Sequence, residues 1–298
     1  MKKLLLLLMV LGLLPLPLKI HAAQVKLKYI GTIYTDAAGV ALQEPAGVTI
    51  TEDKLLIADS GGKRILTFIY QKGEVRPDQV FAVPEMYPLM VQPAANGDLY
   101  VLDGRARQIT VLDAAGKSKG KFAAKGVPSS QRMVPRSIKT APDGSLLVLD
   151  IFSERVLQFD QTGNFQRQFE FPQQYGAIAD MTMDRAGNVY LVDSVEKRVY
   201  IYRTGSDEFV ALTPNMSSYM NFPTSLTTDN QGTLFLVDQY GSGLAIVGID
   251  GSFDGRRLGM GWSDSQLYYP EQVSINAAGD LFIADTKNNR VQHFSVAN

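Results

Sequence analysis

The sequence predicts an all-β protein, a six-bladed β-propeller with four antiparallel strands in each blade, and three observations support this prediction. A short apolar run ends in aspartate six times, 43 to 47 residues apart, which is the length of a propeller blade. Turns, often with glycine, separate short alternating runs of the kind that form antiparallel strands. The last repeat lacks a strand, and a strand-like segment precedes the first repeat. The six aspartates are Asp59, Asp103, Asp150, Asp193, Asp238 and Asp285.

The strands of each repeat follow in a fixed order, from the centre of the ring outward. The innermost strand is expected to begin fourteen or fifteen residues before the aspartate, at Pro45, Pro88, Pro135, Ile178, Pro223 and Pro270. The apolar run that ends in aspartate is the second strand. The segment 26–34 can supply the outer strand that the last repeat lacks. This pairing would close the ring and hide the free edges of the first and last sheets.

The first 23 residues have the pattern of a signal peptide. Lys2 and Lys3 precede an apolar stretch, Leu4 to Leu18, and small residues follow at 22–23. That stretch is shorter than the ~20 residues of a membrane-spanning helix. The sequence therefore predicts export to the periplasm or the cell exterior, with no transmembrane segment after cleavage. The single propeller domain is expected to occupy residues 24–298.

Composition excludes several classes of function. Without the first 23 residues the chain has 26 basic and 30 acidic side chains, and this net charge of −4 argues against general nucleic-acid binding. The chain has no cysteine, which excludes disulfides, thiol chemistry and cysteine-ligated metals. The sequence leaves the oligomeric state open.

The repeated aspartates are interpreted as structural residues. An arginine follows five residues later in four repeats, at the start of the third strand, where the two side chains would lie across a hairpin and could pair. A carboxylate needed for chemistry is needed once and not six times. The four arginines are Arg64, Arg155, Arg198 and Arg290.

The repeat pattern resembles the NHL repeat. The copy that fits best is the last one, where Pro270, the Gly279 turn and the strand ending in Ala284-Asp285 lead to Arg290-Val291. The resemblance implies a six-bladed propeller and covers essentially the whole chain after the signal peptide. It does not imply one activity, since such propellers serve as protein-binding scaffolds, RNA-binding domains and, more rarely, enzymes.

Known propeller enzymes show which side chains a catalytic site in this fold would need. The resemblance extends to peptide-amidating lyases, which hold zinc with several histidines, and to streptogramin-type lyases, which also rely on histidine. This chain has only His21 and His293, and the first lies in the predicted signal peptide. A histidine-rich site cannot be assembled, so we expect no metal, no cofactor and no assigned catalytic residue. His293 is expected to be packed in the last blade.

Calcium-dependent lactonases of six-bladed form use carboxylate and amide side chains at the channel mouth, and this class is not excluded by counting histidines. The residues just after the start of each innermost strand should face or flank that mouth. The polar candidates there are Arg136, Asp180, Glu271 and Gln272. Two acids beside an arginine suit a calcium ion poorly. They suit an internal salt-bridge network or the binding of a polar ligand.

The connections that enter the blades are rich in methionine and aromatic residues, which are enriched in protein interfaces. The same connection of each blade lies on the same face of the ring. For Tyr87, Phe222 and Tyr269, directly before a proline, packing between neighbouring blades is the favoured interpretation. The candidates for a binding surface are Tyr175, Tyr219, Met220, Trp262 and Tyr268.

Positive charge is concentrated between Gly104 and Thr140, with nine basic residues and one acid. Such a basic sector can steer an acidic partner toward the protein. An alternative for the lysines is that they line an outer strand and prevent edge-to-edge pairing. The residues assigned to the sector are Arg105, Arg107, Lys117, Lys119, Lys121 and Arg132.

The leading interpretation is therefore an exported, non-enzymatic module that binds a protein with an acidic surface. The alternative is a hydrolase or lyase whose site lies at the channel mouth. Binding of RNA would use the same basic sector, but it conflicts with export.

Overall fold

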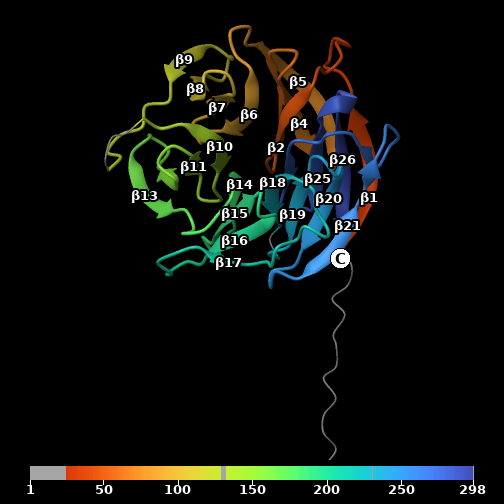
Figure 1. The fold of residues 1–298 in the computed structure, drawn as a ribbon. Coiled ribbons are helices and arrows are strands. Elements are labelled where there is room, and N and C mark those ends of the chain that lie inside the picture. Colours follow the sequence, from red (N-terminus) through yellow and green to blue (C-terminus); the bar gives the residue numbers. More distant parts are fainter. Residues whose placement is uncertain (1–24, 129–131, 230, 298) are drawn as a thin grey trace, which may run out of the picture.

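The computed structural model describes residues 25–128, 132–229 and 231–297, and the predicted signal peptide lies outside these residues. Six four-stranded antiparallel sheets form a ring, with their first strands toward the centre and their last strands at the rim (Figure 1). The prediction of an all-β, six-bladed propeller is confirmed. None of the helices in the described ranges has the length and apolar character needed to cross a bilayer.

The six blades follow one another along the chain. Blade 1 contains β2 (Pro45–Ile50), β3 (Lys54–Asp59), β4 (Arg64–Gln71) and β5 (Glu74–Ala82). Blade 2 contains β6 (Pro88–Pro93), β7 (Leu99–Asp103), β8 (Gln108–Leu112) and β9 (Ser118–Lys121). Blade 3 contains β10 (Pro135–Thr140), β11 (Leu146–Asp150), β12 (Arg155–Phe159) and β13 (Phe165–Glu170).

Blade 4 contains β14 (Ile178–Met183), β15 (Val189–Asp193), β16 (Arg198–Tyr202) and the short β17 (Val210–Ala211). Blade 5 contains β18 (Pro223–Thr228), β19 (Leu234–Asp238), β20 (Gly243–Val247) and β21 (Phe253–Arg257). Blade 6 contains β24 (Val273–Ile275), β25 (Asp280–Asp285), β26 (Arg290–Ala297) and β1 (Lys26–Ile33).

The ring closes in blade 6, where the two ends of the chain meet. Strand β1 pairs with β26 in antiparallel register, with Tyr29 opposite Phe294 and the two rings in edge contact at 5.9 Å. Strand β26 therefore has a partner on both sides, β25 and β1 (Figure 1). The prediction that the N-terminal segment supplies the missing outer strand is confirmed.

One strand start differs from the prediction. Regular pairing of the innermost strand of blade 6 begins at Val273 and not at Pro270. The backbone before it still exchanges hydrogen bonds with Ala284, which accepts from Glu271 N at 3.0 Å and donates to Gln272 O at 2.9 Å. The long connection before this strand contains a parallel pair that the repeat pattern does not predict, β22 (Gly259–Met260) with β23 (Gln266–Leu267).

The hydrophobic core lies between neighbouring blades. The second strand of every blade is buried on both of its faces, because each sheet packs against a sheet on either side. A strand buried on both faces is continuously apolar and does not alternate. This is why the runs before each aspartate consist almost entirely of Leu, Val, Ile, Phe, Tyr and Ala.

The six repeat aspartates bind the connection that enters their own blade. Each accepts a hydrogen bond from a backbone N–H one or two residues before the position where the sequence predicts the start of the innermost strand, for example from Gln43 to Asp59 at 2.6 Å and from Val134 to Asp150 at 2.9 Å. Asp193 accepts from four backbone groups, those of Gly176, Ala177, Val195 and Glu196. The corresponding donors in the other blades are Tyr87, Asn221, Phe222 and Tyr268.

Ion pairing of these aspartates is less regular than the sequence predicts. Arg64 and Arg290 pair with Asp59 and Asp285, each at 2.7 Å. In blade 5, Arg256 of β21 reaches Asp238 at 2.5 Å.

The two pairs expected in blades 3 and 4 are absent from the described residues. Arg155 instead donates to Gln168 Oε1 on the outer strand at 2.6 Å, which draws its guanidinium away from Asp150. In blade 4 the carboxylate of Asp193 is already occupied by backbone donors, and Arg198 has a buried Nε without a partner.

Replacement of Asp193 by alanine tests the structural role of the repeat aspartates. It removes four part-buried hydrogen bonds from backbone N–H groups to a carboxylate, and each such bond contributes about 0.5–1.5 kcal/mol or somewhat more. We expect the free energy of unfolding to fall by about 3 kcal/mol or more in urea denaturation. The control is Asp207→Ala at an exposed position, with an expected change within about 0.5 kcal/mol. Equal stability of the two variants would contradict a structural role.

Candidate functional site

The repeat places two kinds of loop on one face of the ring. In blade 5, Pro223 at the start of the first strand lies opposite Asp238 at the end of the second. The connection that enters a blade and the loop between its second and third strands are therefore neighbours on one side, which we call the loop face. The turns between first and second strands lie on the opposite side, which we call the turn face.

Five aromatic side chains form a continuous surface on the loop face of blades 5 and 6, which we call the aromatic ribbon. Phe222 stacks on Tyr240 at 4.7 Å, and Tyr240 contacts the edge of Tyr269 at 6.0 Å. Tyr268 lies 5.1 Å from Tyr269 and 5.8 Å from Trp262. Trp262 is 74% exposed and Tyr240 is 53% exposed. The ribbon thus gathers exposed aromatic side chains in one place on the surface, a feature that marks interaction sites.

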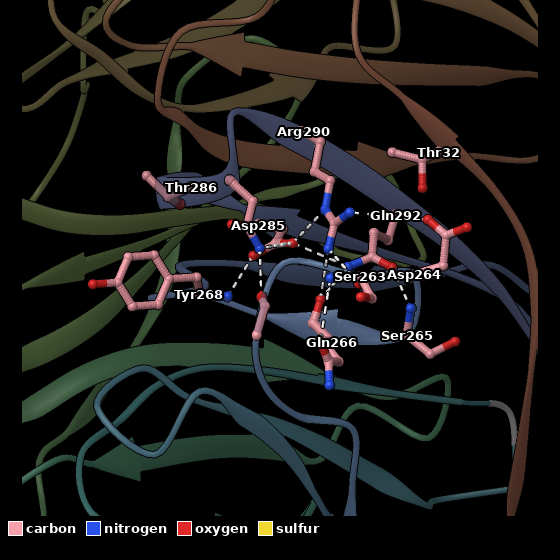
Figure 2. Close-up of polar contacts among 12 residues, drawn as sticks. Thr32, Ser263, Asp264, Ser265, Gln266, Tyr268, Asp285, Thr286, Arg290 and Gln292 are labelled. Carbon is pink, nitrogen blue, oxygen red and sulfur yellow. Dashed lines mark hydrogen bonds and ion pairs between the residues drawn. The ribbon is translucent and has the colours of Figure 1, made fainter.

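Side chains of blade 6 fix the segment 263–266, which directly follows Trp262, and Figure 2 shows their contacts with it. Arg290 is held by Asp285 and donates from Nη2 to the carbonyls of Ser263 and Gln266, each at 2.8 Å. Gln292 accepts from Ser265 N at 3.0 Å and donates to the carbonyl of Gln266 at 2.6 Å. A surface held in this way loses little conformational freedom when it binds a partner.

The other predicted loop-face residues have different environments. Tyr219 is about half exposed and stacks on Phe253 at 4.1 Å. Tyr175 is partly buried against Phe171, and burial together with nearby Glu154 raises its pKa to about 12. Met220 is only 1% exposed and belongs to the hydrophobic core between blades 4 and 5, so its side chain is not offered to a partner.

Sequence reasoning missed the exposed apolar residues of the loops that follow the repeat aspartates. Phe152, Val195 and Tyr240 are all more than half exposed there. The available signal was an apolar residue one or two positions after an aspartate, in a loop that is otherwise polar. For Tyr269 the sequence favours packing between blades, but the structure leaves it 38% exposed as a central member of the ribbon.

The predicted basic sector is divided by the fold. Arg105, Arg107 and Arg132 are exposed on loop-face connections, and Arg105 lies over the ring of Tyr87 at 5.4 Å. Lys117 lies in a turn on the opposite face. Lys119 and Lys121 belong to the outer strand β9, where Lys119 pairs with Asp98 at 2.7 Å. Of these six residues, the three arginines therefore lie on the loop face, on blades 2 and 3, whereas the aromatic ribbon lies on blades 5 and 6.

Asp180 is fully buried inside the channel and is satisfied by its neighbours. Its carboxylate accepts from Ser137 Oγ at 2.5 Å, from Ser225 Oγ at 2.7 Å and from Leu226 N at 3.2 Å. Lys139 Nζ lies 3.4 Å from the same carboxylate. This network joins the innermost strands of blades 3, 4 and 5.

The remaining channel-mouth candidates do not join that network. Gln272 is buried, and its Oε1 accepts from Val48 N at 2.7 Å, while its Nε2 has no partner among the described residues. Burial raises the pKa of the Glu271 carboxyl, and the charges of Arg136 and Lys287 offset part of that rise. Arg136 itself is exposed.

The described residues include no group of three or more histidine or carboxylate side chains that could hold a metal ion. His293 is packed inside blade 6, where its ring stacks on Phe282 at 4.1 Å and its Nε2 lies 2.6 Å from Asp280. Burial lowers the pKa of His293, and the neighbouring carboxylate opposes that shift. This environment matches the packed histidine expected from the sequence.

Comparison with known proteins places the fold. The NHL repeat family matches residues 267–294, and no curated protein sequence is significantly similar to the chain. A streptogramin B lyase superposes with a TM-score of 0.61 at 14% identity, covering 92% of this chain and 98% of that one. A luciferin-regenerating enzyme gives 0.62 at 14% identity, covering 90% and 96%. Hydrazine synthase of Kuenenia stuttgartiensis gives 0.60 at 13% identity, covering 91% and 99%.

Identities this low establish a shared fold and no shared activity. The fold, the closing strand and the matched repeat agree with one another. The chain is a six-bladed β-propeller that carries an NHL repeat.

Proposed function

We propose that the chain is an exported, non-enzymatic module that binds another protein through its loop face. The aromatic ribbon carries this proposal, because tyrosine and tryptophan are the residue types that most often dominate binding energy at protein interfaces. The support of Trp262 by Arg290 and Gln292 adds preorganisation. Arg105, Arg107 and Arg132 on the same face favour a partner with an acidic surface.

Substitution of the ribbon tests this function. Immobilised wild-type protein is exposed to a periplasmic extract, and captured proteins are identified by mass spectrometry and then titrated in pure form. We expect Tyr240→Ser and Trp262→Ser each to weaken binding by about 2 kcal/mol, about thirtyfold in affinity. The matched control is Ile249→Ser, since Ile249 is 62% exposed but lies in a turn on the opposite face. Equal capture by all variants would refute the proposal.

The contribution of charge has its own test with the captured partner. Reversal of two arginines in the variant Arg107→Glu/Arg132→Glu removes the attraction to an acidic surface. We expect the association rate at low salt to fall by about tenfold, with a smaller change at high salt because ions screen the interaction. Lys72→Glu/Lys117→Glu changes the same number of charges on exposed residues of the turn face and should bind like the wild type. An unchanged rate for the arginine variant would exclude steering by this sector.

A second candidate function is hydrolysis or elimination at the channel mouth. The raised pKa of the Glu271 carboxyl favours it, because a carboxylic acid that keeps its proton to higher pH can act as a general acid. Several proteins of similar fold are enzymes, which gives this alternative comparable weight.

Screening against lactones and esters separates the two functions. If Glu271 is a general acid, turnover should fall as the pH rises through its pKa, because the protonated form is then lost. Glu271→Gln should reduce turnover by about a hundredfold or more. The control Glu85→Gln alters an exposed acid in the connection that enters blade 2, on the same face. Absence of turnover with wild-type protein would count against the enzyme, and loss of turnover only in the Glu271 variant would displace the binding module as the leading function.

A further inference from the structure

A large cavity lies on the turn face, on the opposite side of the molecule from the aromatic ribbon. Its volume is about 720 Å³, and all six blades contribute to its wall. Pockets of this size commonly hold small organic molecules. The cavity opens where the innermost strands end, so it is separate from Arg136 and Glu271, which lie where those strands begin.

A ring of polar side chains forms the inner wall of this cavity. Each blade supplies one of them, from the fourth residue after the position where its innermost strand was expected to start. The six are Thr49, Gln92, Lys139, Thr182, Thr227 and Ser274. On blades 6, 1 and 2 these polar side chains form hydrogen bonds between neighbouring blades. Ile50 N donates to Ser274 Oγ at 3.1 Å, and Gln92 Nε2 donates to Thr49 Oγ1 at 2.9 Å.

The other half of the ring, on blades 3, 4 and 5, has unused donors. The hydroxyls of Thr182 and Thr227 make no hydrogen bond with other described residues, although both side chains are largely enclosed. Lys139 has one carboxylate neighbour, Asp180 at 3.4 Å, and an ammonium group has three N–H donors. Lys139, Thr182 and Thr227 occupy equivalent positions on consecutive blades, so their spare donors line the same side of the cavity.

Three such donors, one of them cationic, suit a single carboxylate group. The opening of the cavity has the opposite charge. Glu52, Asp143, Asp184 and Asp229 lie there, with Arg185 as the basic residue among the lining groups of the turns. This arrangement disfavours polyanions and favours a molecule whose outer end is cationic.

We propose that the turn-face cavity binds a small zwitterion of the amino-acid or short-peptide type. Its carboxylate would contact Lys139, Thr182 and Thr227, and its amine would lie toward the acidic opening. Asp180 does not need Lys139 to satisfy its oxygens, because Ser137, Ser225 and Leu226 already donate to them. Lys139 can therefore turn toward a ligand without leaving an unsatisfied buried carboxylate.

Calorimetric titration of the purified full chain tests the site with defined probes. The probes are the individual L-amino acids, triglycine, and three molecules of other classes, namely acetate, glucose and glycerol 3-phosphate. We expect saturable binding of one equivalent of an amino acid or of triglycine. The probe that binds more strongly shows whether the natural ligand is a free amino acid or a short peptide. Thr182→Val/Thr227→Val should weaken that binding by about tenfold, because it removes two donors and keeps the Lys139–Asp180 pair.

Lys139→Met should weaken binding more strongly, and thermal unfolding checks that this variant is folded. The matched control is Lys117→Met, an exposed lysine in a turn of blade 2, with unchanged binding expected. Lack of binding by every amino acid and by triglycine would overturn the proposal. Preferential binding of acetate, glucose or glycerol 3-phosphate would overturn the ligand class, and binding unaffected by the Thr182/Thr227 change would overturn the site.

Discussion

The hydrogen bond from each repeat aspartate to the connection that enters its blade is the interaction on which the rest of the structure depends. It is present in all six blades, although the donor shifts by a residue and the arginine partner is often missing. It fixes the point where the chain crosses from the rim to the centre. A long connection can then vary in sequence while its last residues remain in register with the innermost strand.

This constraint makes the loop face available for function. The connection before blade 6 runs from 258 to 272, and only its end is fixed by Asp285 through Tyr268 N. The middle is held by Arg290 and Gln292 instead, which leaves Trp262 exposed on a supported loop. One arginine therefore serves both the repeat aspartate and the loop that carries the aromatic ribbon. Structural and functional roles overlap at this residue.

The fold could be predicted in detail because the repeats sample the same strand pattern six times and the ends complement each other. The site could not, for physical reasons that particular residues illustrate. Met220 and Trp262 lie in similar loops, but Met220 fills a gap between two blades while no blade covers Trp262. Lys139, Thr182 and Thr227 are distant in the sequence and ordinary in type, and only the ring brings them to one cavity. Arg155 binds Gln168 and not Asp150. Which of the two partners it binds depends on how far its side chain reaches across the sheet, and the repeat pattern does not contain this information.

The two candidate binding surfaces are chemically distinct because they lie at opposite ends of the same strands. On the loop face, exposed aromatic rings gain by excluding water, so a large protein surface is the suitable partner. On the turn face, the cavity is concave and open to solvent on one side, and its spare groups are hydrogen-bond donors, so a small polar molecule suits it. Between the two, Asp180 links blades 3, 4 and 5 with bonds that do not require a ligand.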